Sequence, residues 1–319
     1  MHIVITGASG LVGRALTARI LAHHSDGANG LQMLTLWDVG LAREQIAPKV
    51  CSIGASIADA GVVKQVFERP VDVVYHLASI PGGTAERDYE LGRTVNVDGT
   101  LRLLEAAKAQ VEEGGRAPRF VFASTIGIFG VPMPDVVDDQ TPACPGMTYG
   151  AQKLMGEIAV ADFTRRGWCD GLSLRLPGVL ARPPAPSGLM SAFISDMVRD
   201  TPAGIDVICP MNPDATTWAA STPNVVDNLL LAAEVPTDGL PVHRVFTLPA
   251  LRFSMDDLVD ALVAVHGPEV RKHVIFAPDA RIEELFGRFP ILRTPAAEAI
   301  GFRCDEDLVT LVRRAIEFV

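Results

Sequence analysis

Residues 2–13, HIVITGASGLVG, constrain the fold more than any other stretch, because a short apolar run leads through a glycine-rich turn into a helical pattern. Gly7 permits a tight turn, Gly10 lets the backbone approach a pyrophosphate, and Gly13 lets the helix pack closely on the strand. The free amides at the start of such a helix face a bound anion. We therefore predict a dinucleotide-binding turn here, and a simple turn without a ligand is the alternative.

Apolar runs alternate with helical patterns up to about residue 175. The runs are apolar on both faces, which is typical of buried strands in parallel sheets. Repeated strand–helix units of this kind predict an α/β fold with a Rossmann-type doubly wound parallel sheet. The predicted strands are 2–6, 31–38, 71–78, 119–125 and 171–176, and the predicted helices are 11–23, 98–113 and 150–166.

The pattern changes after Leu176, where the proline-rich stretch PGVLARPPAPSG predicts a loop or a domain crossing. We predict a dinucleotide-binding domain over 1–175, to which 219–248 returns. A smaller, mostly helical C-terminal substrate lobe is predicted over 176–218 and 249–319, where it would cap the carboxyl edge of the sheet. Its expected helices lie near 189–199, 223–234, 254–266 and 305–318.

The composition excludes several classes of function. A formal charge of −10 argues against a nucleic-acid partner, which needs a clustered basic surface. No stretch approaches the roughly 18 apolar residues that a membrane span requires, and HIVITG follows the first residue without a secretion signal, so we expect a cytoplasmic protein. Five scattered cysteines and seven scattered histidines offer no disulfide framework and no metal-ligand spacing, so we expect no metal.

Asp38 closes the second predicted strand, 25 residues after Gly13. A carboxylate at this position can hold both ribose hydroxyls of an adenosine and would repel a 2′-phosphate. The sequence therefore favours NAD over NADP as the cofactor. A solvated aspartate in a turn is the alternative interpretation.

Tyr149 and Lys153 lie one helical turn apart in TYGAQK, so they share a face of the third predicted helix. Ser124 and Thr125 end a predicted strand, at the edge of the sheet where ligands bind. A tyrosine with a pKa of about 10 can act as a base near neutral pH only if a neighbouring cation lowers that pKa. A surface tyrosine packed over a lysine stem is the alternative.

These features together resemble the extended short-chain dehydrogenases/reductases of the NAD-dependent epimerase/dehydratase family. The resemblance covers essentially the whole chain, and it rests on TGASGLVG (6–13), Asp38, YHLAS (75–79), NVDGT (96–100), STIGIFG (124–130), YGAQK (149–153) and LRLPGVLARP (174–183). It implies a catalytic triad of Thr125, Tyr149 and Lys153. Tyr149 would exchange the proton, Thr125 would hydrogen-bond the reacting oxygen, and Lys153 would bind the nicotinamide ribose. The implied cofactor-binding residues are Gly7, Ser9, Gly10, Leu11, Val12, Gly13, Asp38, Ile57, Leu77, Ala78, Ser79, Asn96, Tyr149, Lys153, Pro177 and Val179.

Within that family the chain is most similar to enzymes that oxidise the four-carbon sugar acid D-erythronate with NAD to its 2-oxo acid. A small sugar acid needs a cation for its carboxylate, and Arg182 could supply a bidentate partner, although a solvated loop arginine is the alternative. The expected substrate-binding residues are Ser79, Thr125, Tyr149, Arg182, Ser191 and Trp218, and Trp218 could instead be a packing residue.

Two other functions remain open at this point. A sugar-nucleotide 4-epimerase or dehydratase uses the same scaffold, but its members often carry an Arg-Asp-aromatic stretch where this chain has ATTWAAS (215–221). A non-catalytic NAD-sensing protein would need the glycine turn but not the Tyr149–Lys153 base. Many members also carry an acidic residue after the third strand, where this chain has Ser56. The family resemblance further implies a homodimer built from the helices at 98–113 and 150–166.

Overall fold

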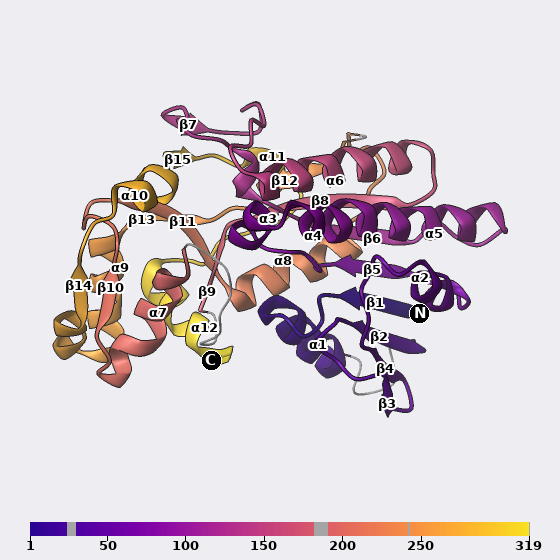
Figure 1. The fold of residues 1–319 in the computed structure, drawn as a ribbon, viewed down its shortest axis with the longest axis horizontal. Helices are drawn as coiled ribbons and strands as arrows, with labels where there is room; N and C mark the ends of the chain where they lie inside the picture. Colours follow the sequence, from indigo (N-terminus) through magenta and orange to yellow (C-terminus); the bar gives the residue numbers. More distant parts are fainter. Residues whose placement is uncertain (24–29, 182–190, 242, 319) are drawn as a thin grey trace. The chain divides into compact units, whose positions relative to one another are not determined.

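The computed structural model describes residues 1–23, 30–181, 191–241 and 243–318. These residues form two compact units, coloured along the sequence in Figure 1. Unit 1 comprises Met1–Ile128, Met147–Arg175 and Leu229–Phe246, and unit 2 comprises Phe129–Gly146, Leu176–Asn228 and Thr247–Val319. These ranges differ from the predicted domains in two places: residues 129–146 group with unit 2, and the segment that returns to unit 1 covers 229–246. The functional division into a cofactor domain and a substrate lobe stays a prediction.

Unit 1 is built around a sheet whose strands, within the described residues, follow the order β12-β8-β6-β5-β1-β2-β4-β3. Strand β1 lies at the centre, with β2 on one side and β5 on the other, and both pair with it in parallel. The chain thus winds outward in both directions from β1, as a doubly wound fold does. The strands are β1 (His2–Thr6), β2 (Met33–Trp37), β3 (Glu44–Ala47), β4 (Val50–Ile53), β5 (Val73–His76), β6 (Arg119–Thr125), β8 (Asp170–Leu176) and β12 (Val245–Thr247).

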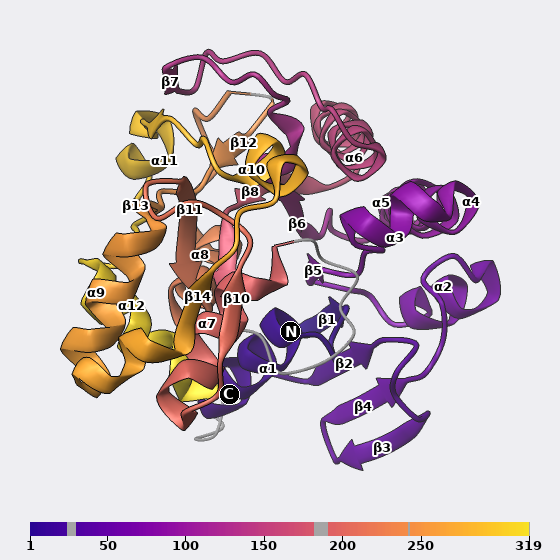
Figure 2. The ribbon, with the colours of Figure 1, turned by 60° about the vertical axis from the view of Figure 1, so that its left-hand side comes forward.

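Helices cover this sheet because its strands are apolar on both faces. Val4, Trp37 and Phe122 point into one core, which α2, α5 and α6 close. α5 and α6 lie side by side over it (Figures 1 and 2). The helical segments of unit 1 are α1 (Leu11–His23), α2 (Ala60–Phe67), α3 (Gly82–Arg87), α4 (Tyr89–Gly92), the π-helix η1 (Arg93–Gly99), α5 (Thr100–Glu112), the 3₁₀ turn η2 (Ile126–Ile128) and α6 (Thr148–Arg165); α8 (Thr222–Glu234) runs from unit 2 into unit 1.

The predicted α/β fold class is confirmed, and the sheet contains a hairpin that the sequence pattern did not reveal. β3 and β4 form an antiparallel pair at the edge of the sheet (Figure 2), while β4 pairs in parallel with β2. β4 is only four residues long and contains Cys51 and Ser52, so it lacks the apolar run that marked the other strands. α6 begins at Thr148, where the amide of that residue donates to the Glu86 carboxylate at 2.9 Å.

Unit 2 combines helices with short strands in three small sheets among the described residues: β10–β14, β13–β11–β9 and β15–β7. The sequence predicted a mostly helical lobe, and these short strands were not predicted. Its elements are β7 (Val136–Val137), β9 (Gly178–Leu180), α7 (Ala192–Asp200), η3 (Thr201–Ala203), β10 (Val207–Cys209), β11 (Thr216–Ser221), β13 (Leu251–Ser254), α9 (Met255–His266), η4 (Pro268–His273), β14 (Val274–Phe276), α10 (Ala280–Phe286), β15 (Ile291–Leu292), α11 (Pro295–Ala299), α12 (Leu308–Ala315) and η5 (Ile316–Phe318).

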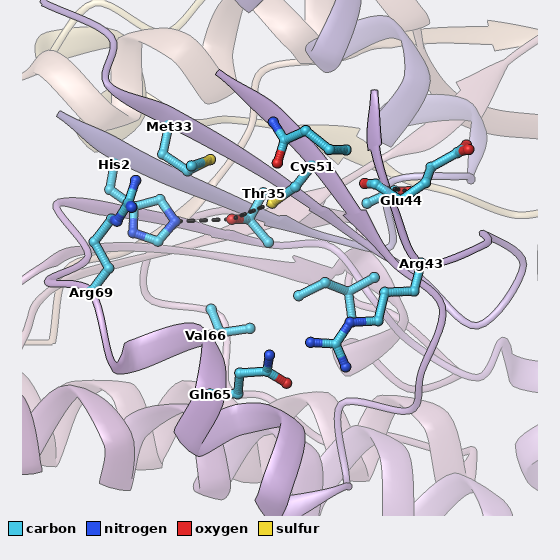
Figure 3. A pocket seen from close by; sticks show the side chains of 12 residues that line it. His2, Met33, Thr35, Arg43, Glu44, Cys51, Gln65, Val66 and Arg69 are labelled. Atoms are coloured by element: carbon cyan, nitrogen blue, oxygen red, sulfur yellow. Dashed lines mark hydrogen bonds between the residues drawn. The ribbon is translucent and has the colours of Figure 1, made fainter. Parts of the chain in front are cut away.

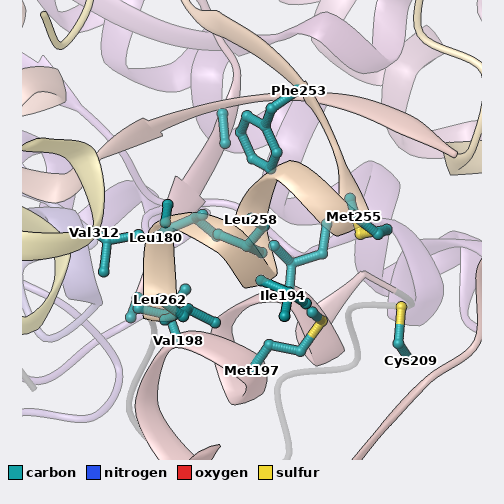
Figure 4. Packing of buried hydrophobic residues seen from close by; sticks show 14 of the residues in the cluster. Leu180, Ile194, Met197, Val198, Cys209, Phe253, Met255, Leu258, Leu262 and Val312 are labelled. Carbon is teal, nitrogen blue, oxygen red and sulfur yellow. The ribbon is translucent and has the colours of Figure 1, made fainter. Parts of the chain in front are cut away.

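A second apolar core lies inside unit 2. Figure 4 shows Met197 from α7, Phe253 from β13 and Leu262 from α9 in this core, together with Val312 from α12. Helix α9 is fixed at its start by a capping box, in which Ser254 and Asp257 each accept from the backbone amide of the other. Among the described residues, no helix is both long and apolar enough to cross a membrane.

Candidate active site

The glycine turn joins β1 to α1 and leaves room for an anion. Gly7 has φ +74°, and a Cβ added there would lie 2.7 Å from the Ala78 amide nitrogen, so both its conformation and its contact with the β5 end require glycine. A Cβ at Gly13 would lie 2.2 Å from the Gly7 carbonyl oxygen, so the helix start packs directly on the turn. The first turn of α1 contains no acidic residue, and its leading amides have no acceptor within a helix. This arrangement fits the pyrophosphate of a dinucleotide.

Asp38 follows β2 and is held against this turn. Its carboxylate oxygens accept from the Ser9 amide at 3.3 Å and from the Gly40 amide at 2.8 Å. The half-buried side chain of Asp38 therefore lies beside the glycine turn, where the sequence argument expects the adenosine ribose. The geometry fits a carboxylate that binds ribose hydroxyls.

The residues that follow β5 form the neighbouring edge of the sheet. The amides of Leu77 and Ala78 donate to the Thr6 carbonyl oxygen and the Thr6 Oγ1, each at 3.2 Å. Leu77, Ala78 and Ser79 are half-buried. They thus lie at the carboxyl ends of β1 and β5, where the winding direction reverses and where ligands bind in such sheets.

Asn96 and Ile57, two further predicted cofactor residues, have buried side chains. Asn96 lies in the π-helix η1, where it exchanges hydrogen bonds with the Ile80 backbone and donates to Gln152 at 2.7 Å. Ile57 packs in the apolar core, and a Cβ added at Gly99 would lie 2.8 Å from it. Asn96 therefore fixes the backbone after β5, and the Ile57 side chain is used for packing.

Helix α6 places Tyr149 and Lys153 on one face, one turn apart. The Lys153 side chain is 2% exposed, and its Nζ donates to the Ala123 carbonyl oxygen at 2.8 Å. The same nitrogen lies 4.8 Å from the centroid of the Phe122 ring and 5.8 Å from that of the Tyr149 ring. Helix and strand approach this closely because residue 156 is glycine: a Cβ there would lie 2.5 Å from Phe122.

The environment of Lys153 makes its charge easy to remove. Burial lowers the pKa of Lys153 from 10.5 to about 7, and the Glu157 carboxylate opposes this fall. In its charged form Lys153 places a cation beside the Tyr149 ring.

Thr125 ends β6, half-buried, at the same sheet edge. Its Oγ1 accepts from the Gly127 amide at 3.0 Å, so the hydroxyl hydrogen stays available to another acceptor. Unit 1 therefore brings the three predicted triad residues to adjoining elements, with β6 and α6 in direct contact.

Two buried residues in this region, Glu157 and His76, were not predicted as site residues. Glu157, one turn after Lys153, is buried; it accepts from Ser124 and forms a bidentate ion pair with Arg175. His76 is wholly buried between the Thr6 and Thr100 hydroxyls, at 2.8 Å from each, and burial together with the Lys153 charge lowers its pKa well below 6.5. A signal existed for Glu157: a carboxylate four residues after Lys153 falls on the same buried helix face.

The remaining predicted residues belong to unit 2. Val179 lies buried on β9 with Pro177 just before it, and Ser191 is half-buried at the start of α7. Trp218 has no exposed surface; its Nε1 donates to the Pro290 carbonyl oxygen at 2.8 Å. This favours the packing role that was considered for Trp218 beside the substrate role. Arg182 lies outside the described residues.

A cavity of about 490 Å³ opens elsewhere on unit 1, beside β1, β2, β4 and α2, and none of the predicted site residues lines it. Figure 3 shows His2, Thr35 and Cys51 from three neighbouring strands beside it, with Arg43 and Arg69 among its other lining residues. Because the glycine turn and the triad lie at the carboxyl ends of the strands, this cavity is not the candidate active site. No group of three or more His, Cys, Asp or Glu side chains is placed to hold a metal within the part of the chain that the structure describes.

The doubly wound sheet, with a glycine turn beside its central strand, defines the class of Rossmann-type dinucleotide-binding proteins. More particularly, the chain belongs to the NAD dependent epimerase/dehydratase family, whose model matches residues 3–215. It is accordingly an oxidoreductase that uses a nicotinamide dinucleotide.

Two curated relatives match the chain over nearly its full length. D-erythronate dehydrogenase from Cupriavidus necator is 32% identical, over 99% of this chain and 98% of the relative. D-erythronate dehydrogenase from Haemophilus influenzae is 28% identical, over 100% of this chain and 99% of the relative.

Among solved structures, a nucleoside-diphosphate-sugar epimerase from Agrobacterium tumefaciens superposes with a TM-score of 0.92 at 31% identity, covering 99% of this chain and 94% of that chain. An L-threonine dehydrogenase from Cupriavidus necator superposes with a TM-score of 0.84 at 21% identity, covering 99% of both chains, and this similarity supports the fold.

Proposed function

We propose that this chain is an NAD-dependent dehydrogenase that oxidises the 2-hydroxyl of a small sugar acid, with D-erythronate as substrate and 2-dehydro-D-erythronate as product. One observation carries the choice of substrate: two curated D-erythronate dehydrogenases match practically the whole chain. The buried Lys153 beside Tyr149, at the carboxyl edge of the sheet, supports an oxidation that needs a base.

Three residues of unit 1 have separate roles in such an oxidation. The bound dinucleotide supplies the hydride acceptor. Tyr149 takes the proton of the substrate hydroxyl, and Thr125 donates a hydrogen bond to the same oxygen. The Lys153 ammonium donates to the Ala123 carbonyl; with its other hydrogens it would bind the cofactor ribose, and its charge would favour the tyrosinate. General-base catalysis of this kind contributes about 10²–10⁴-fold.

The choice of NAD over NADP follows from Asp38 in this proposal. Its carboxylate is oriented by the Ser9 and Gly40 amides beside the glycine turn. There it would accept from ribose hydroxyls and would repel a 2′-phosphate. Arg43, in the same loop region, is the cation that would become a partner for the phosphate if Asp38 were removed.

Three further residues are proposed to contact the substrate. Arg182 is the predicted partner of the carboxylate of the acid, and Ser191 and Ser79 are predicted partners of its hydroxyls. A fully desolvated charged partner is worth a few kcal/mol to an anion, so Arg182→Leu should weaken binding of the acid and leave NAD binding unchanged.

A direct absorbance assay of NADH formation tests the proposal. The purified protein is incubated with NAD and a panel of four- to six-carbon sugar acids, and reduced cofactor is followed at 340 nm. We expect the largest kcat/KM for D-erythronate. If another acid is oxidised in preference to D-erythronate, the proposed reaction type stands and the proposed substrate is wrong.

A sugar-nucleotide 4-epimerase is the second candidate, because one structure at 31% identity is described as a nucleoside-diphosphate-sugar epimerase. Against it, β11 presents Thr217 and Trp218, both buried, where the family members often carry an Arg-Asp-aromatic stretch. Incubation with uridine-diphosphate sugars, followed by chromatography of the sugars, distinguishes this candidate. A non-catalytic NAD sensor would bind NAD and turn over none of these compounds.

A homodimer is also proposed, from exposed apolar side chains on the two adjacent helices. Leu101 on α5 is 39% exposed, and Met155 and Ile158 on α6 are 52% and 64% exposed. Exposed apolar side chains that gather on one surface mark association sites, and these two helices pack against each other. Light scattering after gel filtration gives the oligomeric state directly.

A further inference from the structure

A buried carboxylate lies behind the proposed catalytic lysine, on the same face of α6. Glu157 is 2% exposed, and its Oε1 accepts from Ser124 Oγ at 2.5 Å. Arg175, from β8, donates through Nε to Oε1 at 3.0 Å and through Nη2 to Oε2 at 2.8 Å. Glu157 therefore ties α6 to the carboxyl ends of β6 and β8. Helix α6 and strand β6 carry the proposed triad.

The Glu157 carboxylate has hydrogen-bonding partners on both of its oxygens. A buried carboxylate is costly unless an opposite charge and hydrogen bonds compensate it, and here a bidentate arginine and a hydroxyl do so. Apolar residues in place of both Glu157 and Arg175 would fill the same volume at lower electrostatic cost. Retaining a charge at this position thus calls for an explanation beyond packing.

The explanation lies in the groups that face Lys153. From β6 it meets the Ala123 carbonyl and the Phe122 ring, and from β5 it faces His76, whose own pKa is lowered and which therefore stays neutral. On its own helix, Tyr149 lies one turn before Lys153 and Glu157 one turn after it, and Lys153 and Glu157 bond to the neighbouring β6 residues Ala123 and Ser124. Burial lowers the pKa of Lys153 to about 7, and Glu157 acts in the opposite direction.

We propose that Glu157 is a positioning residue: its carboxylate, fixed by Ser124 and Arg175, keeps the buried Lys153 ammonium charged and in place beside Tyr149. The proposal rests on the proposed function only in calling Lys153 and Tyr149 catalytic, because the effect on the charge of Lys153 exists without any substrate. It assigns to Glu157 no contact with substrate or cofactor.

The test is a direct titration of Lys153 in the cofactor-free protein. The chain has five lysines, so a protein labelled with ¹³C at lysine Cε gives few signals, and the Lys153→Met variant identifies the one from Lys153. We expect a midpoint near 7 for Lys153, well below the value of about 10.4 typical of exposed lysines. In Glu157→Gln the amide keeps the shape and an acceptor oxygen while the charge is lost, and the midpoint should fall by about one pH unit or more.

Two further variants separate charge from packing. Ser124→Ala removes one hydrogen bond and leaves the carboxylate charge, so the Lys153 midpoint should stay within about 0.3 of the wild-type value. If Glu157→Gln does not fold because Arg175 loses its partner, the double variant Glu157→Gln/Arg175→Gln replaces the ion pair by two amides. Because the double variant also lacks the Arg175 charge, its midpoint is compared with that of Arg175→Gln and should lie below it. An unchanged midpoint, in folded Glu157→Gln relative to wild type or in the double variant relative to Arg175→Gln, overturns the proposal.

The outcomes for this proposal and for the proposed function are distinguishable. A lowered Lys153 midpoint in a protein that oxidises no sugar acid supports the role of Glu157 and removes the substrate assignment. An unchanged Lys153 midpoint in Glu157→Gln, in a protein that oxidises D-erythronate, would support the substrate assignment and exclude the role of Glu157. Where both hold, the pH below which Lys153 stays charged should move down in Glu157→Gln. A midpoint that moves from about 7 to about 6 lowers the charged fraction of Lys153 at pH 7 from about one half to about one tenth. kcat/KM at pH 7 should therefore fall about fivefold and approach the wild-type value at lower pH.

Discussion

Replacing Lys153 by methionine should change how the stability of unit 1 depends on pH. Lys153 is 2% exposed, and its pKa is about 7 in the folded chain against 10.5 ordinarily. A difference of about 3.5 in pKa, at about 1.36 kcal/mol for each unit, means that keeping this lysine protonated costs the folded state up to about 5 kcal/mol. Methionine has a similar length and carries no charge, so it removes this cost.

The sign of the pH dependence follows from the two pKa values. Because the folded value lies below the unfolded one, the unfolded chain binds more protons between about pH 7 and pH 10.5. The contribution of Lys153 to stability therefore rises with pH across this window, and below about pH 7 the folded protein carries the whole cost. Between pH 7.5 and 9.0 the wild type should gain about 2 kcal/mol relative to Lys153→Met.

Urea unfolding at a series of pH values measures this difference. Trp37 and Trp168 lie in unit 1, so a Trp218→Phe background makes the fluorescence report on that unit. Methionine also leaves the Ala123 carbonyl without its donor, which costs about 1–3 kcal/mol at every pH; the slope is therefore the informative quantity. Lys64→Met, at an exposed position on α2, is the matched control and should show no slope. A difference between wild type and Lys153→Met that stays flat across this range would refute the reasoning.

Three other predictions concern activity, cofactor choice and assembly. Tyr149→Phe should lower kcat by about 10²–10⁴-fold and leave the Kd for NAD within about threefold of wild type in calorimetry, because only the proton acceptor is lost; retention of more than about a tenth of the rate excludes Tyr149 as the base. Asp38→Ala should narrow the ratio of kcat/KM for NAD over NADP by at least about tenfold, the value of one charged contact, whereas equal use of both cofactors by the unmodified protein contradicts the role of Asp38. Ile158→Glu should convert the dimer to a monomer in light scattering without loss of helicity, since it places a charge on an apolar contact surface; a wild-type protein that is already monomeric removes the proposed interface.

The backbone of the candidate site was predictable because it depends on local signals. The strand before Gly7, the helix after Gly13 and the helix that carries Tyr149 each follow from apolar periodicity and glycine positions, and the structure has them within a few residues of the predicted bounds. β4 escaped detection, since four residues that include Cys51 and Ser52 lack a periodic signal.

The contacts that tune the site were not predictable, because they join residues far apart in the sequence. The ion pair of Glu157 with Arg175 spans 18 residues, and the hydrogen bonds of His76 to Thr6 and Thr100 span 70 and 24. Periodicity shows that Lys153 lies on a buried helix face, but only the packing of Phe122 and the Ala123 carbonyl around its ammonium shows how strongly its charge is desolvated.

The central claim is that a small sugar acid, not a sugar nucleotide, occupies the site of this oxidoreductase. Calorimetric titration of the protein saturated with NADH measures this most directly, with D-erythronate and uridine-diphosphate glucose as competing ligands and NADH formation from NAD as the parallel readout. We predict binding and oxidation of D-erythronate, with no binding of the sugar nucleotide at the same concentration. Tight binding of uridine-diphosphate glucose without binding or oxidation of D-erythronate would contradict the claim and favour the epimerase.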